Sequence, residues 1–367
     1  DIFNSLGMPT STTVSLVFEL LGGTVAISLI KIANSNGMLQ LGDLLNTDKA
    51  FTVILGIFLS VAIAFFFGAV VQYISRLIFT FNYKKHARYF IGLFAGLAAT
   101  SILYFMLIKG LKGSAFMEGG LKDLIYGNTD KVVWGAFIFF TILMQVLYWL
   151  KVNVFKVVIL MGTFALALAF AGNDLVNFIG VPLASYDAWQ IAREAGSESI
   201  MMGELAEPAR ANFLLLLASG LVMVLTLFFS KKSQHVTETE LSLASQHEGE
   251  ERFGSTFISR SLVRATLVLN TMWTGLIPVR MQKAIDRRFE PLPAEERSSA
   301  PYDMIRAVVN LTAASILIAI GTSYQLPLST TYVVFMVAMG SSLADRTWGR
   351  ESAVYRITGV MAVISGW

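Results

Sequence analysis

The sequence predicts an all-α integral membrane protein that contains an internal repeat. Only 14% of the 367 residues are charged and 55% are hydrophobic, whereas soluble domains carry roughly 25% charged residues. The mean hydropathy is +0.63, and apolar stretches that could cross about 30 Å of hydrocarbon recur along the chain. A short polar motif occurs near both ends, at Ser11–Thr13 and at Ser329–Thr331. Together these observations favour helices in lipid.

The apolar stretches give the predicted spans. Seven stretches are long enough, or nearly so, to cross the bilayer: 14–31, 51–80, 89–108, 133–150, 154–171, 213–229 and 304–321. Two further stretches, 332–344 and 353–367, are shorter. The chain begins with Asp1 and stops inside the last stretch, so we expect that both ends are cut.

The connections between spans differ in charge. Basic residues crowd the connections 81–88 (with which we count Arg76), 151–153 and 231–303, and the last of these contains ten Lys or Arg. The connections 33–49 and 110–130 contain few. The positive-inside rule assigns the basic connections to the cytoplasm. We therefore divide the chain into a membrane region 1–230, a cytoplasmic loop 231–303 and a membrane end 304–367.

The cytoplasmic loop has two parts. Residues 233–255 are polar and acidic without an apolar period, which is typical of a linker. Residues 256–290 mix apolar residues with Arg and Lys, which predicts amphipathic helices on or near the membrane surface. The loop could be a spacer between two halves or a site for a partner.

The two polar motifs align at a constant offset of 318 residues. With Ser11 placed on Ser329, Pro9 meets Pro327, Thr12 and Thr13 meet Thr330 and Thr331, and Gly22 meets Gly340. We interpret the match as the remnant of an internal repeat. Each motif predicts a helix start, where a hydroxyl caps N–H groups. Two such starts could also hold one tetrahedral oxyanion, because N–H groups and helix dipoles attract negative charge.

A third polar place follows the span 154–171. Asn173, Asp174 and Asn177 lie between Gly172, Gly180 and Pro182, so we expect a loosened and broken helix at 168–187. A carboxylate is costly in lipid and should face a cavity. Its oxygens, with unwound backbone carbonyls, would suit Na⁺ or a proton relay. The alternative is a polar loop in water.

Two further groups of charges stand at or inside apolar stretches. Glu19 lies within the run that follows Ser11, where it could bind a coupling ion, accept a proton or pack between helices. Asp345, Arg346 and Arg350 follow the second motif. They are predicted to mark the exit from the membrane, with ion pairing or gating as the alternative.

The sequence offers little support for metal, nucleotide or catalytic sites. The chain has no cysteine, and its three histidines lie in polar connections without metal-ligand spacing. No nucleotide-binding GxxxxGK[ST] loop occurs. Asp174 and Asp187 could form an intramembrane aspartyl dyad, but they lie on one short stretch and not on two facing helices. We therefore expect no enzyme, no cofactor and no nucleic-acid partner.

These motifs resemble the inorganic phosphate transporter (PiT) family. The resemblance rests on "AGNDLVNFIG" at 171–180, on the two Ser-Thr-Thr stretches and on the long polar loop. It implies an inverted-repeat secondary transporter with broken helices or re-entrant hairpins. Ala171 and Gly172 are swapped relative to the family pattern. The Asn-Asp signature of the first half is absent, and we expect it upstream of Asp1.

The resemblance also implies a site and a mechanism. Phosphate would be held by Ser11, Thr12, Thr13, Ser329, Thr330 and Thr331. Asn173 and Asp174 would belong to the shared ion and phosphate site, with Asn177 nearby, and we add Glu19 from its place in the apolar run. The expected function is symport of inorganic phosphate with Na⁺ or H⁺, and the lack of an intramembrane histidine favours Na⁺.

Several alternatives stay open at this point. The chain could carry another oxyanion such as sulfate, or it could be a phosphate-sensing receptor that transports nothing. The expected location is the plasma membrane, where the chain would be a multi-pass protein in the lipid bilayer. A homodimer is a further possibility.

Overall fold

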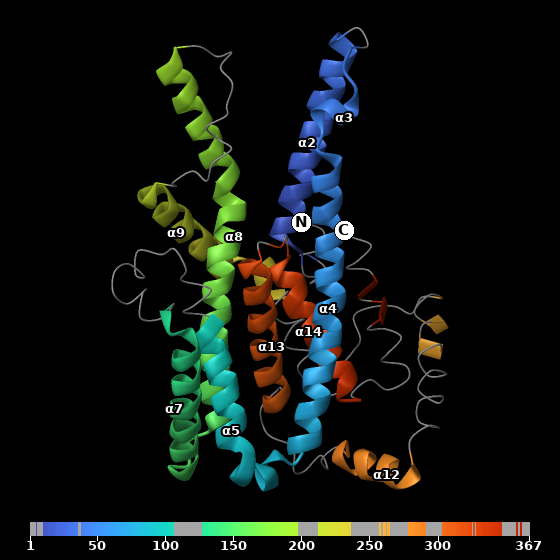
Figure 1. Ribbon diagram of the computed structural model, residues 1–367, viewed down its shortest axis with the longest axis vertical. Coiled ribbons are helices and arrows are strands. Elements are labelled where there is room, and N and C mark those ends of the chain that lie inside the picture. The colour runs from blue at the N-terminus through green and yellow to red at the C-terminus, as the bar shows by residue number, and fades with distance from the viewer. Residues whose placement is uncertain are drawn as a thin grey trace.

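A computed structural model describes residues 10–35, 38–105, 127–196, 212–235, 278–290, 303–324, 326 and 328–346, together with isolated positions elsewhere. Throughout these ranges every regular element is a helix, and the longer helices run side by side along the long axis of the molecule (Figure 1). They are α2 (Thr12–Asn34), α3 (Leu41–Leu44), α4 (Thr47–Phe79), α5 (Tyr83–Leu103), α7 (Thr129–Trp149), α8 (Val154–Ala195), α9 (Phe213–Phe229), α12 (Val279–Arg288), α13 (Met304–Ser323) and α14 (Thr330–Ala344).

The prediction of an all-α membrane protein is confirmed. Among the described residues, five helices are long and apolar enough to cross a membrane: Thr12–Asn34, Ala50–Phe79, Thr129–Trp149, Val154–Ala171 and Met304–Gly321. The apolar parts of α5, α9 and α14 are shorter. Large apolar side chains point outward from the spans; Leu160 and Phe164 of α8, for example, are 70% and 63% exposed. Such surfaces require lipid around them.

Helices α13 and α14 form an antiparallel hairpin. At one end of the hairpin Gly321 of α13 touches Leu328, which precedes α14. At the other end Arg306 of α13 donates to Asp345, which follows α14. At about 1.5 Å per residue, the 15 residues of α14 extend only about 22 Å, too short to cross the bilayer. The second leg of the hairpin is therefore shorter than a membrane span, whereas α13 is long enough to be one.

The hairpin packs on α4 through two glycines. A side chain at Gly68 of α4 would come within 2.6 Å of the carbonyl oxygen of Val337, and one at Gly340 of α14 would collide with the backbone of Phe65. Small residues at these positions let the two backbones approach closely, as is common between membrane helices. Around this contact lies the first hydrophobic core, formed mainly by α4, α13 and α14.

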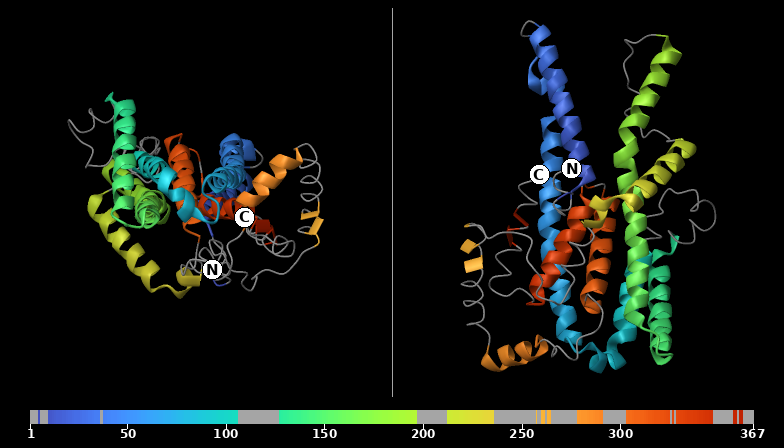
Figure 2. Two further views of the ribbon diagram at one scale, coloured as in Figure 1. Left: turned by 90° about the horizontal axis from the view of Figure 1, so that it is seen from below. Right: turned by 180° about the vertical axis from the view of Figure 1, so that it is seen from behind.

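The second hydrophobic core joins α5, α7 and α8 to the start of α13. Here too glycine permits close approach, because a side chain at Gly96 of α5 would come within 2.8 Å of the backbone of Thr141 on α7. The two cores meet at α13. Figure 2 shows the resulting bundle from below and from behind, with α12 beside the lower end of α4.

One expectation about backbone is wrong. Residues 168–187 are not unwound, because α8 is a continuous helix from Val154 to Ala195 with Pro182 inside it. Pro182 removes one N–H and leaves the carbonyl of Phe178 without its helical partner. The ring of Pro182 is exposed and lies beyond the apolar span that ends at Ala171. A carbonyl there can bind water, so the helix continues.

Candidate functional site

The two repeated motifs form the same local structure. Ser11 is the N-cap of α2, and its Oγ accepts a hydrogen bond of 3.1 Å from the N–H of Val14. Ser329 is the N-cap of α14, and its Oγ accepts a bond of 3.1 Å from the N–H of Tyr332. Both serines are buried. In each motif the first hydroxyl therefore caps the helix, as the capping interpretation predicts.

The second hydroxyl of each motif reaches one shared carboxylate. Thr12 Oγ1 donates to Asp174 Oδ1 at 3.2 Å, and Thr330 Oγ1 donates to the same oxygen at 3.3 Å. Residues 318 positions apart in the sequence thus meet on α8. In Figure 1, α2 runs upward from the middle of the molecule and the hairpin of α13 and α14 lies below it. The shared carboxylate lies where these elements meet.

Asn177 extends this cluster. It lies three residues after Asp174 on α8, so both side chains occupy one face of the helix. Its Nδ2 donates to Thr13 Oγ1 at 2.8 Å and to Thr12 Oγ1 at 3.2 Å. We call Thr12, Thr13, Asp174, Asn177 and Thr330 the hydroxyl cluster. The structure thus brings together five of the residues that the sequence predicts as site residues.

The other predicted site residues are placed differently. Thr331 follows Thr330 on α14 and is half-buried. Asn173 lies within α8, but its side chain lies outside the described part of the structure, as do Pro9 and Pro327 of the two motifs. Glu19 does not join the hydroxyl cluster. Its side chain is exposed, and it lies eight residues beyond Ser11, which is about 12 Å along α2.

The continuous helix also changes the expected ion site. Residues 168–187 are helical, and apart from Phe178, whose carbonyl loses its partner at Pro182, their carbonyls take part in helical hydrogen bonds, so they do not form a cage of unwound backbone oxygens. Asp174 and Asp187 are separated by 13 residues, about 20 Å along α8, too far to act as a catalytic dyad. Without these carbonyls, the expected ligands of a cation are reduced to the side-chain oxygens of the hydroxyl cluster.

The charges around the hydroxyl cluster come from two helix ends and one carboxylate. Two helix N-termini converge on it, and each carries a partial charge of about +0.5. The carboxylate of Asp174 is half-buried between them and offsets about one positive charge. Three threonine hydroxyls and one amide supply donors that fit either Asp174 or an oxyanion. These donors are therefore of the kind that an oxyanion requires.

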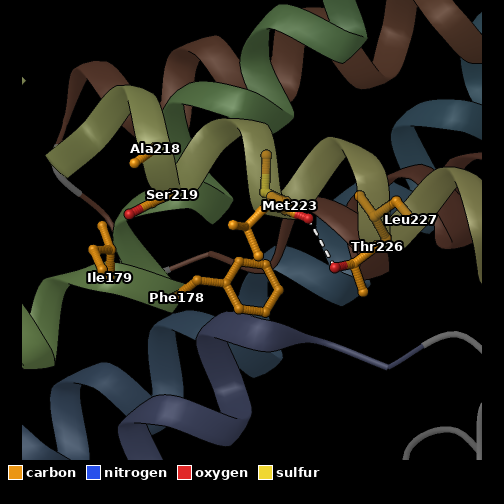
Figure 3. Close-up of a pocket in the computed structure, with 8 residues that line it drawn as sticks. Phe178, Ile179, Ala218, Ser219, Met223, Thr226 and Leu227 are labelled. Atoms are coloured by element: carbon orange, nitrogen blue, oxygen red, sulfur yellow. Dashed lines mark hydrogen bonds between the residues drawn. The ribbon is translucent and has the colours of Figure 1, made fainter. Parts of the chain in front are cut away.

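A separate apolar cavity of about 470 Å³ lies between α8 and α9 (Figure 3). Phe178 and Ile179 of α8 and Met223 of α9 are among its lining residues. The hydroxyls of Ser219 and Thr226 donate to carbonyls of their own helix, at 2.6 and 2.7 Å. The described residues of the lining include no charged residue, so this part of the cavity suits an apolar group and not phosphate.

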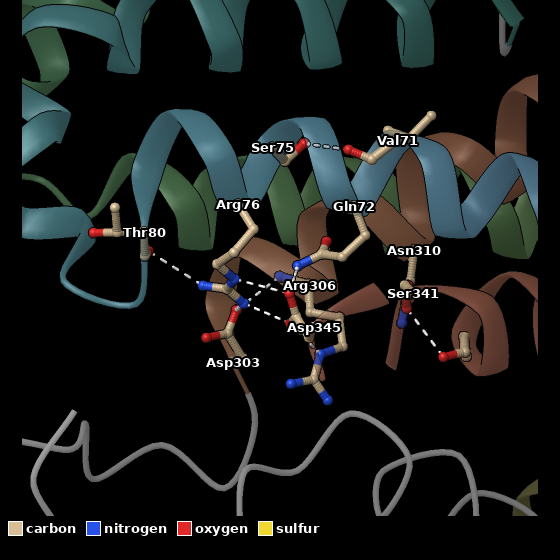
Figure 4. A network of polar contacts seen from close by, with 11 residues as sticks. Val71, Gln72, Ser75, Arg76, Thr80, Asp303, Arg306, Asn310, Ser341 and Asp345 are labelled. Atoms are coloured by element: carbon tan, nitrogen blue, oxygen red, sulfur yellow. Dashed lines mark hydrogen bonds and ion pairs between the residues drawn. The ribbon is translucent and has the colours of Figure 1, made fainter. Parts of the chain in front are cut away.

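A buried ionic network closes the far end of the hairpin (Figure 4). Arg76 of α4 donates to Asp345 twice, from Nε at 2.8 Å and from Nη2 at 2.6 Å. Arg306 Nε donates to Asp345 at 2.9 Å, and Gln72 Nε2 donates to it at 2.8 Å. Asp303 lies 3.1 Å from Arg76 Nη2. Two positive and two negative side chains thus balance each other in the protein interior.

The sequence predicted ion pairing only as the alternative role of Asp345 and did not indicate its buried partners. It placed Arg76 with the basic connection 81–88 and Asp345 at the membrane exit, yet both side chains are fully buried. The available signal was Asp303 and Arg306, three residues apart at the start of the span 304–321. Asp303 accepts a bond of 2.9 Å from the N–H of Arg306. Burial alone would raise the pKa of Asp303, but the charges of Arg76 and Arg306 hold it below its ordinary value.

Comparison with known proteins adds one finding. A family model described as the phosphate transporter family matches residues 2–237, which is more than half of the chain. The matched range includes the first motif and the part of α8 with Asp174 and Asn177. A search of curated proteins and a search of solved structures each gave no match.

Proposed function

This chain belongs to the phosphate transporter family, and we propose that it is a secondary symporter in which a cation drives inorganic phosphate across the plasma membrane. The observation that carries the proposal is the convergence of Thr12 and Thr330, from the two repeated helix starts, on one oxygen of Asp174. The phosphate would bind at the hydroxyl cluster, with the N-terminal ends of α2 and α14 on either side. Ser11, Ser329 and Thr331 complete the two helix starts.

The charges around Asp174 explain why a cation is needed. The two helix ends together contribute about one positive charge, which Asp174 already offsets. A phosphate dianion that entered alone would add two negative charges to a site with no remaining positive charge, at a high cost in a low-dielectric interior. A cation bound to Asp174 reduces this cost and releases the threonine hydroxyls for the phosphate oxygens. Binding of the two ions is thereby coupled.

Na⁺ is the cation that we favour, with H⁺ as the alternative. Carboxylate, amide and hydroxyl oxygens suit a hard cation such as Na⁺. A proton could instead neutralise Asp174 directly. We propose that access then alternates by rocking of one repeat against the other, which is common among transporters with inverted repeats.

Uptake of radiolabelled phosphate tests this proposal. The protein is placed in proteoliposomes with an inward Na⁺ gradient, with an inward proton gradient, or with neither. We expect uptake under one gradient, inhibition by arsenate, and no inhibition by sulfate. Inhibition by sulfate would instead favour a carrier of other oxyanions. Absence of uptake under every gradient, with the protein shown to be folded and inserted, would refute transport and favour a phosphate sensor.

A pair of variants tests the role of Asp174. We expect Asp174→Asn to abolish gradient-driven uptake, because asparagine cannot offer the negative charge that binds the cation. Asp187→Asn is the matched control, because Asp187 is half-buried on the same helix but lies about 20 Å away along its axis. Coupled uptake that survives Asp174→Asn would contradict the assignment.

A further inference from the structure

Helix α12 differs from the spans in composition and orientation. It comprises Val279–Arg288 in the loop 231–303, beyond the range of the family match. Figures 1 and 2 show α12 beside the lower end of α4 in both side views, lying crosswise to the spans. The ends of α4 and α7 lie at the same level. Trp149, the last residue of α7, is 69% exposed there, and exposed tryptophan is typical of a membrane interface.

The sequence of α12 divides it into two faces. Arg280, Lys283 and Arg287 are spaced at i, i+3 and i+7, so they share one face, and all three are exposed. Met281 and Ile285 lie on the opposite side, four residues apart, and Met281 is 52% exposed. Arg288, which is half-buried, ends that side. A short helix with a cationic face and an apolar face is the pattern of helices that lie in the plane of a membrane surface.

Contacts with the bundle fix the end of α12. Phe289, the residue after the helix, is buried and stacks on Tyr73 of α4 with ring centroids 5.2 Å apart. The guanidinium of Arg346 lies 4.7 Å from the centre of the Phe289 ring, and its Nη1 lies 2.7 Å from Asp286 Oδ1. The acidic side chain of α12 thus pairs with the bundle, whereas the three residues of its cationic face are exposed.

We propose that α12 is an interfacial helix that binds anionic phospholipid headgroups on the cytoplasmic leaflet. Charge complementarity supports this partner, because three cations on one face match phosphate groups spread over a surface. The position of α12 at the level of the helix ends brings that face to the headgroups, and the long Lys and Arg stems can reach along the interface. An acidic soluble partner would need neither the exposed Met281 nor the crosswise orientation beside the lower end of α4.

Lipid-selective fluorescence quenching tests the proposal on the full-length protein. The chain has no cysteine, so Ala284→Cys, at an exposed position between the two faces, takes a single environment-sensitive fluorophore. Two sets of proteoliposomes contain the same mixture of phosphatidylglycerol and phosphatidylcholine in both leaflets. They differ only in which of the two lipids carries the quencher near its headgroup. Surface charge is therefore identical, and the ratio of the two quenching efficiencies reports the local enrichment of anionic lipid.

We expect quenching by labelled phosphatidylglycerol to exceed that by labelled phosphatidylcholine about twofold or more, and the excess to fall as salt is added. Lys283→Gln/Arg287→Gln should remove most of the excess. Lys151→Gln/Lys156→Gln removes two exposed cations elsewhere and should leave it unchanged. Equal quenching by both lipids in the unaltered helix, or an excess that survives Lys283→Gln/Arg287→Gln, would overturn the proposal. Absence of quenching by either lipid would also overturn it and would assign α12 to a soluble partner.

Discussion

Replacing Asp345 by asparagine tests the energetic role of the buried network. The carboxylate of Asp345 has no exposed surface and accepts hydrogen bonds from Gln72, Arg76 and Arg306. Asparagine keeps the size of the side chain but removes its charge. Two buried guanidinium groups would then face the single carboxylate of Asp303, which leaves one positive charge uncompensated.

The expected cost is large. Breaking a buried ion pair by removing one partner costs about 3–5 kcal/mol, because the remaining charge stays desolvated. Adding Arg306→Gln restores electrical neutrality, so the double variant should be more stable than Asp345→Asn alone by about 1–3 kcal/mol. The control is Asp286→Asn, which breaks the ion pair with Arg346. Those side chains are 61% and 50% exposed, and exposed pairs contribute about 1 kcal/mol or less.

The assay is unfolding of the purified protein in mixed micelles with increasing denaturing detergent, followed by circular dichroism. The free energy of unfolding of each variant is compared with that of the wild-type protein. The reasoning would be refuted if Asp345→Asn and Asp286→Asn had equal, small effects. It would also be refuted if the loss of unfolding free energy in the double variant equalled the sum of the losses in Asp345→Asn and Arg306→Gln, because the charges would then not interact.

Three further predictions follow from the close contacts and the charges. Gly68→Ala should lower the free energy of unfolding by about 1–3 kcal/mol in the same assay, because the added methyl group would meet the backbone of α14. Thr12→Val and Thr330→Val should each raise the phosphate concentration for half-maximal uptake about tenfold, the equivalent of one hydrogen bond to a charged group at ~1.4 kcal/mol. The lowered pKa of Asp303 gives stability that is complete above the ordinary carboxyl pKa of about 4 and is lost as the pH falls through the lower folded value. The free energy of unfolding should therefore fall below about pH 4 in the wild-type protein and less steeply in Asp303→Asn.

Matched controls distinguish these effects from general damage. Gly22→Ala places a methyl group where no atom lies within 4 Å, so it should be neutral or slightly stabilising through its better helix propensity. Thr163→Val removes an exposed hydroxyl that donates only to the carbonyl of Ile159 and should leave uptake unchanged. A prediction would be contradicted if a variant and its control lost equal amounts of stability or uptake. The prediction for Asp303 would be contradicted if the free energy of unfolding fell equally steeply with pH in the wild-type protein and in Asp303→Asn.

Sequence was sufficient for features that depend on local chemistry or on repetition. The caps at Ser11 and Ser329 follow from hydroxyls before apolar runs, and the constant offset between the motifs indicated that their helix starts are related. The cost of a carboxylate in lipid pointed to Asp174. These arguments need only one segment at a time, or two segments of similar sequence.

Features that depend on packing between unlike segments were not predictable in the same way. Gly172, Gly180 and Pro182 suggested a broken helix, but the remaining residues of α8 favour helix strongly enough to continue through them. Arg76 and Asp345 stand beside polar connections in the sequence, and only the antiparallel hairpin brings them together in the interior. Glu19 has the same apolar neighbours as a buried residue, yet it lies on the exposed side of α2.

The unbroken path of α8 has a practical consequence for observing the protein at work. From its N-cap at Asn153 to Asp174 the helix contains no proline, over a length of about 30 Å. Such a helix moves as a rigid unit, so a displacement of Asp174 also displaces the N-terminal end of the segment. A spectroscopic label at Lys156, which is exposed near that end, would therefore register the arrival of phosphate from outside the binding site, without touching any residue that holds it.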